Sequence, residues 1–187
     1  RLDVFLVLVV CVATVSAQSF SKYARNDSTI LIFSSVTDPV DACLVKSSKN
    51  PGNNTSGVSN FVPIEPQLEM FLKGKPGIKK LGFLYNPGEL NSISLIKKLK
   101  EVCPKYGIEL VTVSASKTSE VSQSAVKLSE LVDAIFVSND NTALSAFKTI
   151  VKAANNVSIP VFVSDTDIVK DGAVAALGPN QYNLGLQ

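Results

Sequence analysis

Short apolar runs rich in β-branched residues recur along the whole chain. They fall at residues 4–10, 29–33, 80–85, 108–113, 134–137, 159–163 and 173–177. These runs lack the polar alternation of a half-exposed strand, which is typical of parallel strands that are covered on both faces. The pattern therefore predicts a series of buried parallel strands.

The segments between these runs have helical spacing. Apolar residues recur on one helical face at Ile93, Ile96, Leu99 and Cys103, at Val121, Ala125 and Leu128, and at Leu144, Phe147, Val151 and Ala154. Strands that alternate with helices join into a parallel sheet with helices on both sides. The sequence thus predicts an α/β fold.

The first residues admit two interpretations. The apolar run that follows Arg1, together with Val15, Ser16 and Ala17, is typical of a secretory signal peptide and its cleavage site. The same stretch also fits a buried strand at 4–10 followed by a helix at 13–25. We favour the strand and helix, because the chain opens on Arg and an acidic residue precedes the apolar run. The run is too short to span a membrane.

The alternation of predicted strands and helices is interrupted once, over residues 49–77. Residues 49–57 are rich in Asn, Gly and Ser, which predicts an exposed loop, and the proline-rich segment 61–77 predicts a crossing between lobes with a short helix near Leu68. We therefore expect four parts. They are a partial N-terminal lobe at 1–60 (strand, helix, strand), the crossing and helix at 61–77, a C-terminal α/β lobe at 78–178, and the start of a return to the first lobe at 179–187.

Composition narrows the possible chemistry. The 187 residues include no His and no Trp, and the net charge is +2. The absence of His argues against catalytic triads and against the commonest zinc sites. The Lys residues are scattered rather than gathered in a basic stripe, so no nucleic-acid partner is expected. No dinucleotide or P-loop fingerprint appears, and nothing completes a metal site around Asp165 and Asp167, so we expect no cofactor and no metal.

Three cysteines, Cys11, Cys43 and Cys103, lie far apart in the sequence. Their odd number and the lack of a CxxC motif do not fit a disulfide framework or a metal knuckle. We expect them to be small buried hydrophobic residues, and a single bridge stays open as an alternative.

Small polar side chains follow four of the predicted strands. The loops concerned are 34–39, 86–92, 138–142 and 164–167. Because the carboxyl ends of parallel strands meet at one edge of a sheet, ligands bind there in open α/β folds. Residues of these types are also ordinary helix caps and turn formers, and that alternative applies to each loop taken singly.

The set of side chains in these loops suits a zwitterion. A buried ammonium group needs a carboxylate and satisfied hydrogen bonds, which Asp38, Asp140 and Asp165 can supply. A ligand carboxylate prefers hydroxyls, amides and backbone N–H groups at helix starts. The candidates for that role or for orienting the cleft are Thr37, Asn86, Asn91, Ser92, Asn141 and Thr142. Glu89 is a further candidate ligand-binding residue in the same loops.

Several short segments resemble those of a known family and follow one another in the same order. They include residues 36–40 (VTDPV), 85–89 (YNPGE), 140–142 (DNT), 159–162 (IPVF) and 172–178 (GAVAALG). Together they resemble the ABC transporter substrate-binding family that includes tryptophan- and phenylalanine-binding members. The chain departs from the family pattern at Asn139, where Thr is frequent, and at 178–183, where two acidic residues are replaced.

The resemblance implies a type I periplasmic binding protein fold: two Rossmann-like lobes with parallel sheets, hinged and closing on a ligand. It also implies that the first lobe here is incomplete, and that the chain is a fragment or a truncated product.

The function implied is that of the substrate-binding component of an ABC importer. It would be a monomer that binds a small amino-acid-like ligand, an aromatic one being the candidate, in the cleft between lobes and without chemistry. Its partner would be a membrane permease, and its location periplasmic or extracytoplasmic, with a membrane anchor in the full-length protein as an option. A sensor with the same fold is the first alternative, and an α/β enzyme that uses Asp140 or Asp165 as a base is the second.

Overall fold

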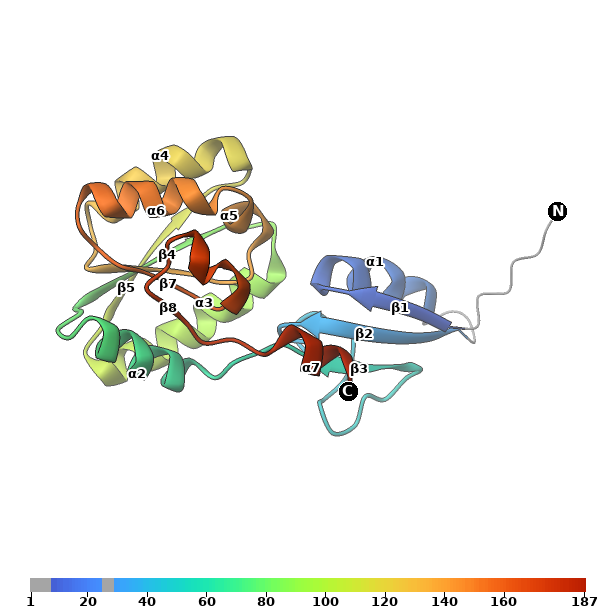
Figure 1. Cartoon of the computed structure of the whole chain (residues 1–187). Helices are drawn as coiled ribbons and strands as arrows, with labels where there is room; N and C mark the ends of the chain where they lie inside the picture. The colour runs from blue at the N-terminus through green and yellow to red at the C-terminus, as the bar shows by residue number, and fades with distance from the viewer. Residues whose placement is uncertain (1–7, 25–28) are drawn as a thin grey trace. The chain divides into compact units, whose positions relative to one another are not determined.

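The computed structural model describes residues 8–24 and 29–187. The chain divides into two compact units, which we call the minor unit (residues 1–61 and 180–187) and the major unit (residues 62–179). Figure 1 shows the elements of each. The predicted strand at 4–10 lies partly outside the described residues, as does the end of the predicted helix at 13–25.

The minor unit holds a three-stranded parallel sheet in the order β1-β2-β3. Its elements are β1 (Leu8–Val12), α1 (Thr14–Ala24), β2 (Ile30–Val36), β3 (Thr55–Ser59) and α7 (Gln181–Gly185). Helix α1 packs against β1 and β2, and α7 contacts β2. The strand-and-helix interpretation of the first residues is therefore confirmed for the part of that segment that the structure describes.

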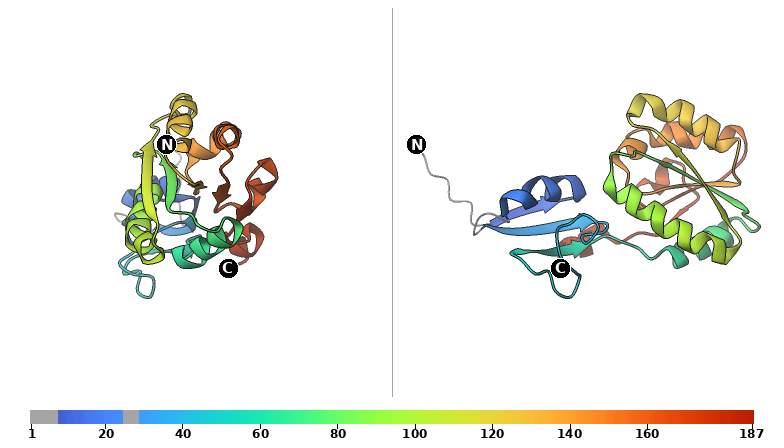
Figure 2. Two further views of the ribbon diagram at one scale, coloured as in Figure 1. Left: turned by 90° about the vertical axis from the view of Figure 1, so that its left-hand side faces the viewer. Right: turned by 180° about the vertical axis from the view of Figure 1, so that it is seen from behind.

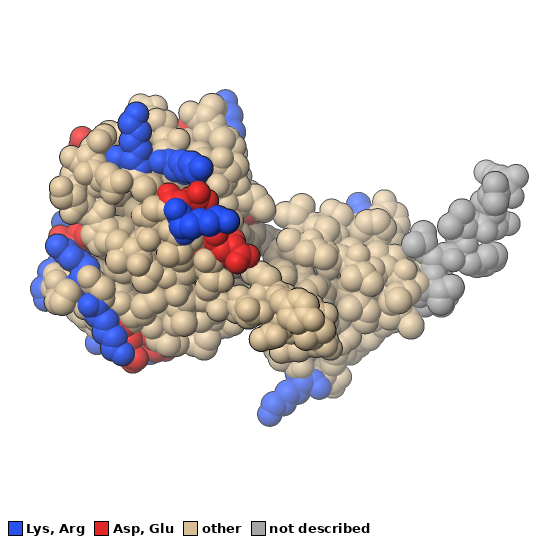
Figure 3. All heavy atoms as spheres, viewed as in Figure 1, with Lys and Arg blue, Asp and Glu red and all other residues tan. Residues whose placement is uncertain are grey.

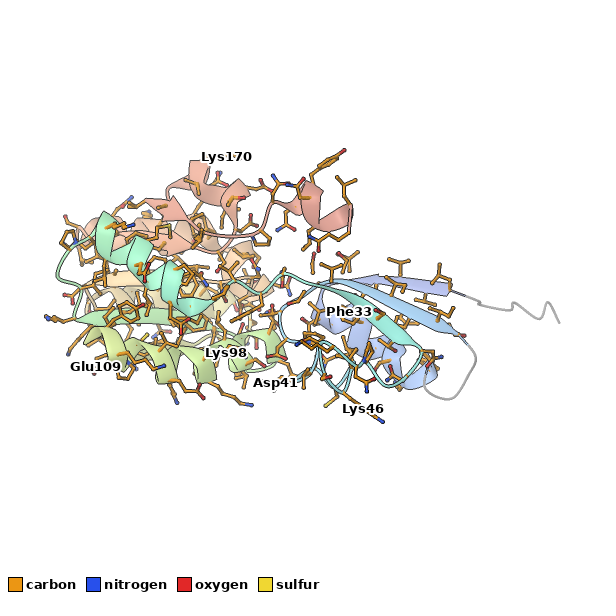
Figure 4. All side chains as sticks on the ribbon, turned by 90° about the horizontal axis from the view of Figure 1, so that it is seen from below. Phe33, Asp41, Lys46, Lys98, Glu109 and Lys170 are labelled. Carbon is orange, nitrogen blue, oxygen red and sulfur yellow. The ribbon has the colours of Figure 1, made fainter. Side chains whose placement is uncertain are left out.

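The prediction of a loop over 49–57 is confirmed for residues 49–54 and is wrong for residues 55–57, which begin strand β3. Val58 is its one apolar residue, which is too little for an apolar signal, and backbone pairing with β2 forms the strand instead. Gly57 allows this pairing to be close, because a Cβ atom there would lie 2.6 Å from the ring of Phe33. Phe33 lies in the minor unit together with Asp41 and Lys46 of the following loop (Figure 4).

The major unit is a doubly wound α/β sandwich around a five-stranded parallel sheet in the order β5-β4-β6-β7-β8. Its elements are α2 (Ile64–Gly74), β4 (Lys80–Tyr85), α3 (Leu90–Val102), η1 (Cys103–Tyr106), β5 (Glu109–Ser114), α4 (Thr118–Ser129), β6 (Ala134–Val137), α5 (Asn141–Ser145), α6 (Phe147–Asn156), β7 (Val161–Val163), η2 (Thr166–Asp171) and β8 (Ala175–Ala176). Helices α4 and α6 cover one face and α2 and α3 the other (Figures 1 and 2).

The strands of this sheet agree with the prediction most closely at its centre. β4 and β6 have the predicted bounds, whereas β7 and β8 are shorter than the predicted 159–163 and 173–177. The helix predicted near Leu68 is α2, and it belongs to the major unit. On this helix, Phe71 stacks on Phe162 with ring centroids 4.6 Å apart and meets Phe136 at 5.0 Å. This contact seals one face of the sheet.

The three cysteines, all in described segments, form no disulfide. Cys11 and Cys103 are buried, as expected, but Cys43 is exposed. Cys43 lies in the loop after β2, has a positive φ of 57° and is not part of the core cluster of the minor unit. Burial raises the pKa of the Cys103 thiol to about 11, so this thiol is protonated at neutral pH.

Two observations concern the surface. Among the described residues, no helix has both the length and the apolar character needed to cross a membrane. On the face shown in Figure 3, Lys side chains of the major unit are interspersed with Asp and Glu, and they do not form a continuous basic band.

A glycine fixes the distance between α4 and the sheet. A Cβ atom at Gly82 would lie 2.9 Å from Cγ2 of Val132 and 3.0 Å from Cγ of Leu128. We expect Gly82→Ala to lower the free energy of unfolding by about 1–3 kcal/mol, because the added methyl group overpacks this contact. Urea unfolding followed by circular dichroism measures the loss. Gly185→Ala is the control, since a Cβ there meets no atom within 4 Å, and an equal effect of both substitutions would contradict the packing argument.

Asp133 ties two strands together at the amino end of the major unit's sheet. Its Oδ2 accepts hydrogen bonds of 2.8 Å from the backbone N–H groups of Lys79 and Lys80. These bonds, the Lys80 one first, hold the pKa of the Asp133 carboxyl below its ordinary value.

The lowered pKa gives a pH-dependent prediction. The stability that Asp133 contributes is present above the unfolded pKa of about 3.9 and is lost as pH falls through the folded pKa. We expect Asp133→Asn to lower the free energy of unfolding by about 1 kcal/mol at pH 7, because the carboxyl is partly exposed. The difference from wild type should shrink below about pH 4 in denaturation curves. A difference that stays constant down to pH 2.5 would contradict the assignment.

Candidate functional site

The order of strands marks one edge of the major unit. Strands β4 and β6 are neighbours, but β4 leads through α3 to β5 on one side, and β6 leads through α5 and α6 to β7 on the other. Chain connections that leave in opposite directions open a crevice at the carboxyl ends of the two strands, where ligands bind in doubly wound sheets. The loops 86–91 and 138–142 lie at this point.

Asp140 is the centre of that edge. Its side chain is 0% exposed. Oδ2 accepts hydrogen bonds from the backbone N–H of Asn86 at 2.7 Å and from Oγ of Ser92 at 2.6 Å, and Oδ1 accepts from the N–H of Ala143 at 2.9 Å. One carboxylate therefore joins the loop after β4, the first turn of α3 and the start of α5.

Glu89 makes a second bridge between the same loops. The carboxylate is 7% exposed. Oε2 accepts from the backbone N–H of Asn141 at 3.0 Å and from its Nδ2 at 2.9 Å, and Oε1 accepts from the N–H of Thr142 at 3.2 Å. Backbone N–H donors stabilise a buried carboxylate much as they do at a helix cap.

Amide side chains complete the network. Nδ2 of Asn86 donates to Oγ1 of Thr142 at 2.8 Å and to the carbonyl of Ser116 at 3.3 Å. Nδ2 of Asn91 donates to the carbonyl of Asn139 at 2.9 Å. The loops after β4, β5 and β6 are thus fixed to one another, which leaves Asn86 and Thr142 half-buried at the rim.

These contacts separate two kinds of predicted site residue. Both oxygens of Asp140 and of Glu89 already accept hydrogen bonds from the protein, and Ser92 is fully buried. Such groups hold the rim in one geometry. Asn86 and Thr142 are half-buried, and Asn141 is exposed, so their polar atoms are the more accessible part of the network.

Asp165 lies at the end of β7 in the same unit. Its Oδ1 accepts from the N–H of Asp167 at 2.9 Å, which caps the start of η2, and its side chain is half-buried. Next to it, Oγ of Ser164 donates to Oε1 of Gln67 at 3.1 Å, and Nε2 of Gln67 donates to the carbonyl of Val62 at 3.0 Å. A Cβ atom at Gly178 would collide with the carbonyl oxygen of Ser164.

The minor unit carries the remaining two predicted residues, Thr37 and Asp38. Oδ1 of Asp38 accepts from the N–H groups of Val40 and Asp41 at 3.1 and 3.0 Å, so the carboxylate caps the turn that follows β2. The carbonyl of Thr37 accepts from Oγ of Ser59 at 3.0 Å. Both residues are half-buried at the carboxyl end of this smaller sheet.

The structure thus brings together one large group of predicted residues. That group consists of Asn86, Glu89, Asn91, Ser92, Asp140, Asn141 and Thr142. Asp165 lies in the same unit at the next strand end, and Thr37 and Asp38 lie in the other unit. Sequence reasoning missed Gln67, because a Gln on an amphipathic helix gives no sign of its partner. Within the described segments, no group of three or more Cys, Asp or Glu side chains could hold a metal ion.

The network around Asp140 has a measurable stabilising effect. We expect Asp140→Ala to lower the free energy of unfolding by about 3 kcal/mol or more, because it leaves three donors without an acceptor in a buried place. Asp165→Ala is the matched control, and its loss of a single cap should cost about 1 kcal/mol. Denaturant titrations of both variants give the comparison, and equal losses would refute the central position of Asp140.

Comparison with known proteins identifies relatives. The family model for ABC transporter substrate-binding proteins matches residues 5–187. A tyrosine-binding protein of Clostridioides difficile is 35% identical over 178 residues, which are 95% of this chain and 51% of that protein. This chain spans about half the length of that curated relative.

Two solved structures are similar as well. A conserved domain protein of Vibrio cholerae is 38% identical with a TM-score of 0.89, and the match covers 97% of this chain and 60% of that one. An ABC domain from Streptococcus pneumoniae in complex with L-Trp is 33% identical with a TM-score of 0.87, and covers 96% and 60%. These matches confirm the predicted fold class, which is that of the type I periplasmic binding proteins.

Proposed function

We propose that this chain, which belongs to the family of ABC transporter substrate-binding proteins, captures an aromatic amino acid for an importer. The observation that carries the proposal is the rigid polar rim at the carboxyl ends of β4 and β6, with Asp140 and Glu89 beneath it. A rim held by buried carboxylates is pre-organised, so a small ligand does not have to order it on binding.

The residues divide into supporting and contacting roles. Asp140, Glu89, Asn91 and Ser92 support the rim, because each is buried and also has its polar atoms engaged within the protein. The ligand would contact the half-buried or exposed residues of the major unit at the ends of β4, β6 and β7, and Thr37 and Asp38 of the minor unit. Those of the major unit are Asn86, Asn141, Thr142 and Asp165.

A zwitterion suits this division. The amide of Asn141 donates one hydrogen bond to Glu89 and can donate a second, so it is suited to the ligand carboxylate, whereas Asn86 and Thr142 donate within the rim and would orient the site. The carboxylates of Asp165 and Asp38 are suited to the ligand's ammonium group. The ligand would lie between the two units, so that binding links them. An aromatic side chain buries about 150–250 Å², which corresponds to roughly 4–6 kcal/mol before the costs of association. The polar rim must supply the remainder of a micromolar affinity.

Relatives support the class of ligand. One relative is named as a tyrosine-binding protein, and a similar structure holds L-Trp. Members of the family deliver ligands to ABC importers, so we propose a membrane permease as partner and an extracytoplasmic location for this chain. We further propose that it acts as a monomer and releases its ligand chemically unchanged.

A thermal-shift screen of the twenty amino acids tests the proposal. We expect L-tryptophan, L-tyrosine or L-phenylalanine to stabilise the chain most. A ligand at 100 times its dissociation constant adds about 2.7 kcal/mol to the free energy of unfolding, which raises the melting temperature by a few degrees. A response to aliphatic but not to aromatic amino acids would refute the aromatic assignment, and no response to any of them would refute the function.

Two variants test whether the ligand binds at the rim. Thr142→Val should weaken binding of the best ligand by about tenfold in calorimetry, because it removes the hydroxyl that links Asn86 to Glu89 and so loosens the rim that the ligand contacts. Thr149→Val, on helix α6, is the matched control and should leave the affinity unchanged. Equal affinity in both variants would place the ligand away from Thr142.

A further inference from the structure

One buried polar atom in the minor unit has no partner. Asn60 follows β3 directly, and its side chain is only 8% exposed. Its carboxamide oxygen, Oδ1, is buried and makes no hydrogen bond. Most buried polar side-chain atoms in folded proteins are paired, so an exception calls for an explanation.

Asn60 lies at the carboxyl end of its sheet, the end at which we propose that the ligand binds. Its backbone N–H donates to the carbonyl of Val36 at 3.3 Å, and Val36 is the last residue of β2. The preceding residue, Ser59, donates through Oγ to the carbonyl of Thr37. Asn60 therefore lies beside the loop that begins with Thr37 and Asp38, at the end of the β2–β3 strand pair.

The chemistry of the atom defines what would satisfy it. A carboxamide oxygen accepts hydrogen bonds and cannot donate them. Leaving it buried and unpaired costs about 1–3 kcal/mol, and a charged donor would recover more than a neutral one. The candidate ligand group at this end of the minor unit is therefore an N–H donor with positive charge.

We propose that Oδ1 of Asn60 accepts a hydrogen bond from the ligand's ammonium group and so makes the site selective for amino acids over the corresponding acids. This inference rests on the proposed function and adds a residue to it. Selectivity follows because a ligand without the amino group would leave the same oxygen unpaired, and sites that hold buried polar groups reject such analogues strongly.

Asn54 offers a matched control in the same unit. It is also an Asn near β3, but its Nδ2 donates to the carbonyl oxygens of Ala24 and Thr29. Truncation of Asn54 removes these bonds and should destabilise the unliganded chain. Truncation of Asn60 removes an unpaired oxygen and should leave the stability of the unliganded chain unchanged or slightly raised.

The experiment compares Asn60→Ala and Asn54→Ala with wild type. Calorimetry measures the dissociation constants of L-tryptophan and 3-indolepropionate, and of L-tyrosine and 3-(4-hydroxyphenyl)propionate. Each pair differs in the amino group alone. We expect Asn60→Ala to weaken binding of the amino acid by at least tenfold and of its des-amino analogue by less than twofold. Asn54→Ala should leave the ratio of the two constants unchanged while lowering the unfolding midpoint.

The outcomes separate this inference from the function on which it rests. A wild-type chain that binds none of the four compounds would overturn the proposed function, and the role of Asn60 with it. A wild-type chain that binds the amino acids, with an unchanged ratio in Asn60→Ala, would overturn the role of Asn60 alone. A fall in the unfolding midpoint of Asn60→Ala equal to that of Asn54→Ala, with no change in the ratio, would assign Asn60 to a structural contact through an ordered water only.

Discussion

The geometry of the larger unit's rim depends on the burial of one carboxylate. Asp140 stands where the sheet's connections diverge, and it accepts hydrogen bonds from three separate pieces of chain. In a dry environment these bonds are stronger than in water, and an unpaired charge would be correspondingly costly. The loops must therefore adopt the conformation that places these donors around the Asp140 carboxylate. Glu89 acts in the same way, because its carboxylate accepts from the N–H groups of Asn141 and Thr142. The positions of the more exposed rim residues are therefore set by these two buried carboxylates.

Much of this architecture could be predicted from the sequence, because burial on both faces leaves a clear signal. The strands β4 and β6 have uninterrupted apolar residues, and their bounds were predicted as they are found. Strand β3 could not be found this way, because Thr55–Ser59 has Val58 as its one apolar residue and becomes a strand only by pairing with β2. Local composition contains no information about a partner strand that is distant in sequence.

The candidate site shows the same division between what local sequence reveals and what it does not. Polar residues were predicted to gather at the carboxyl ends of the strands. The hydrogen bonds confirm this for the residues at the ends of β4 and β6, namely Asn86, Glu89, Asp140 and Thr142. That prediction could not say which acid is engaged by the protein and which is accessible, because that depends on where each loop's N–H groups point. Asp140 and Asp165 look alike in the sequence, yet the first accepts three hydrogen bonds in full burial and the second caps a short helix at the surface.

Ser164 contacts both of the segments that connect the larger unit to the rest of the chain. Its hydroxyl reaches Gln67, which in turn holds the carbonyl oxygens of Val62 and Pro63, where the chain first enters the larger unit. Its carbonyl oxygen lies against Gly178, where the chain is about to leave that unit. Entry and exit thus both meet residue 164, the entry through its side chain and the exit through its backbone. The choice at position 67 therefore depends on the hydroxyl of residue 164, whereas position 178 requires Gly with any residue at 164, because a Cβ atom there would collide with the backbone carbonyl oxygen.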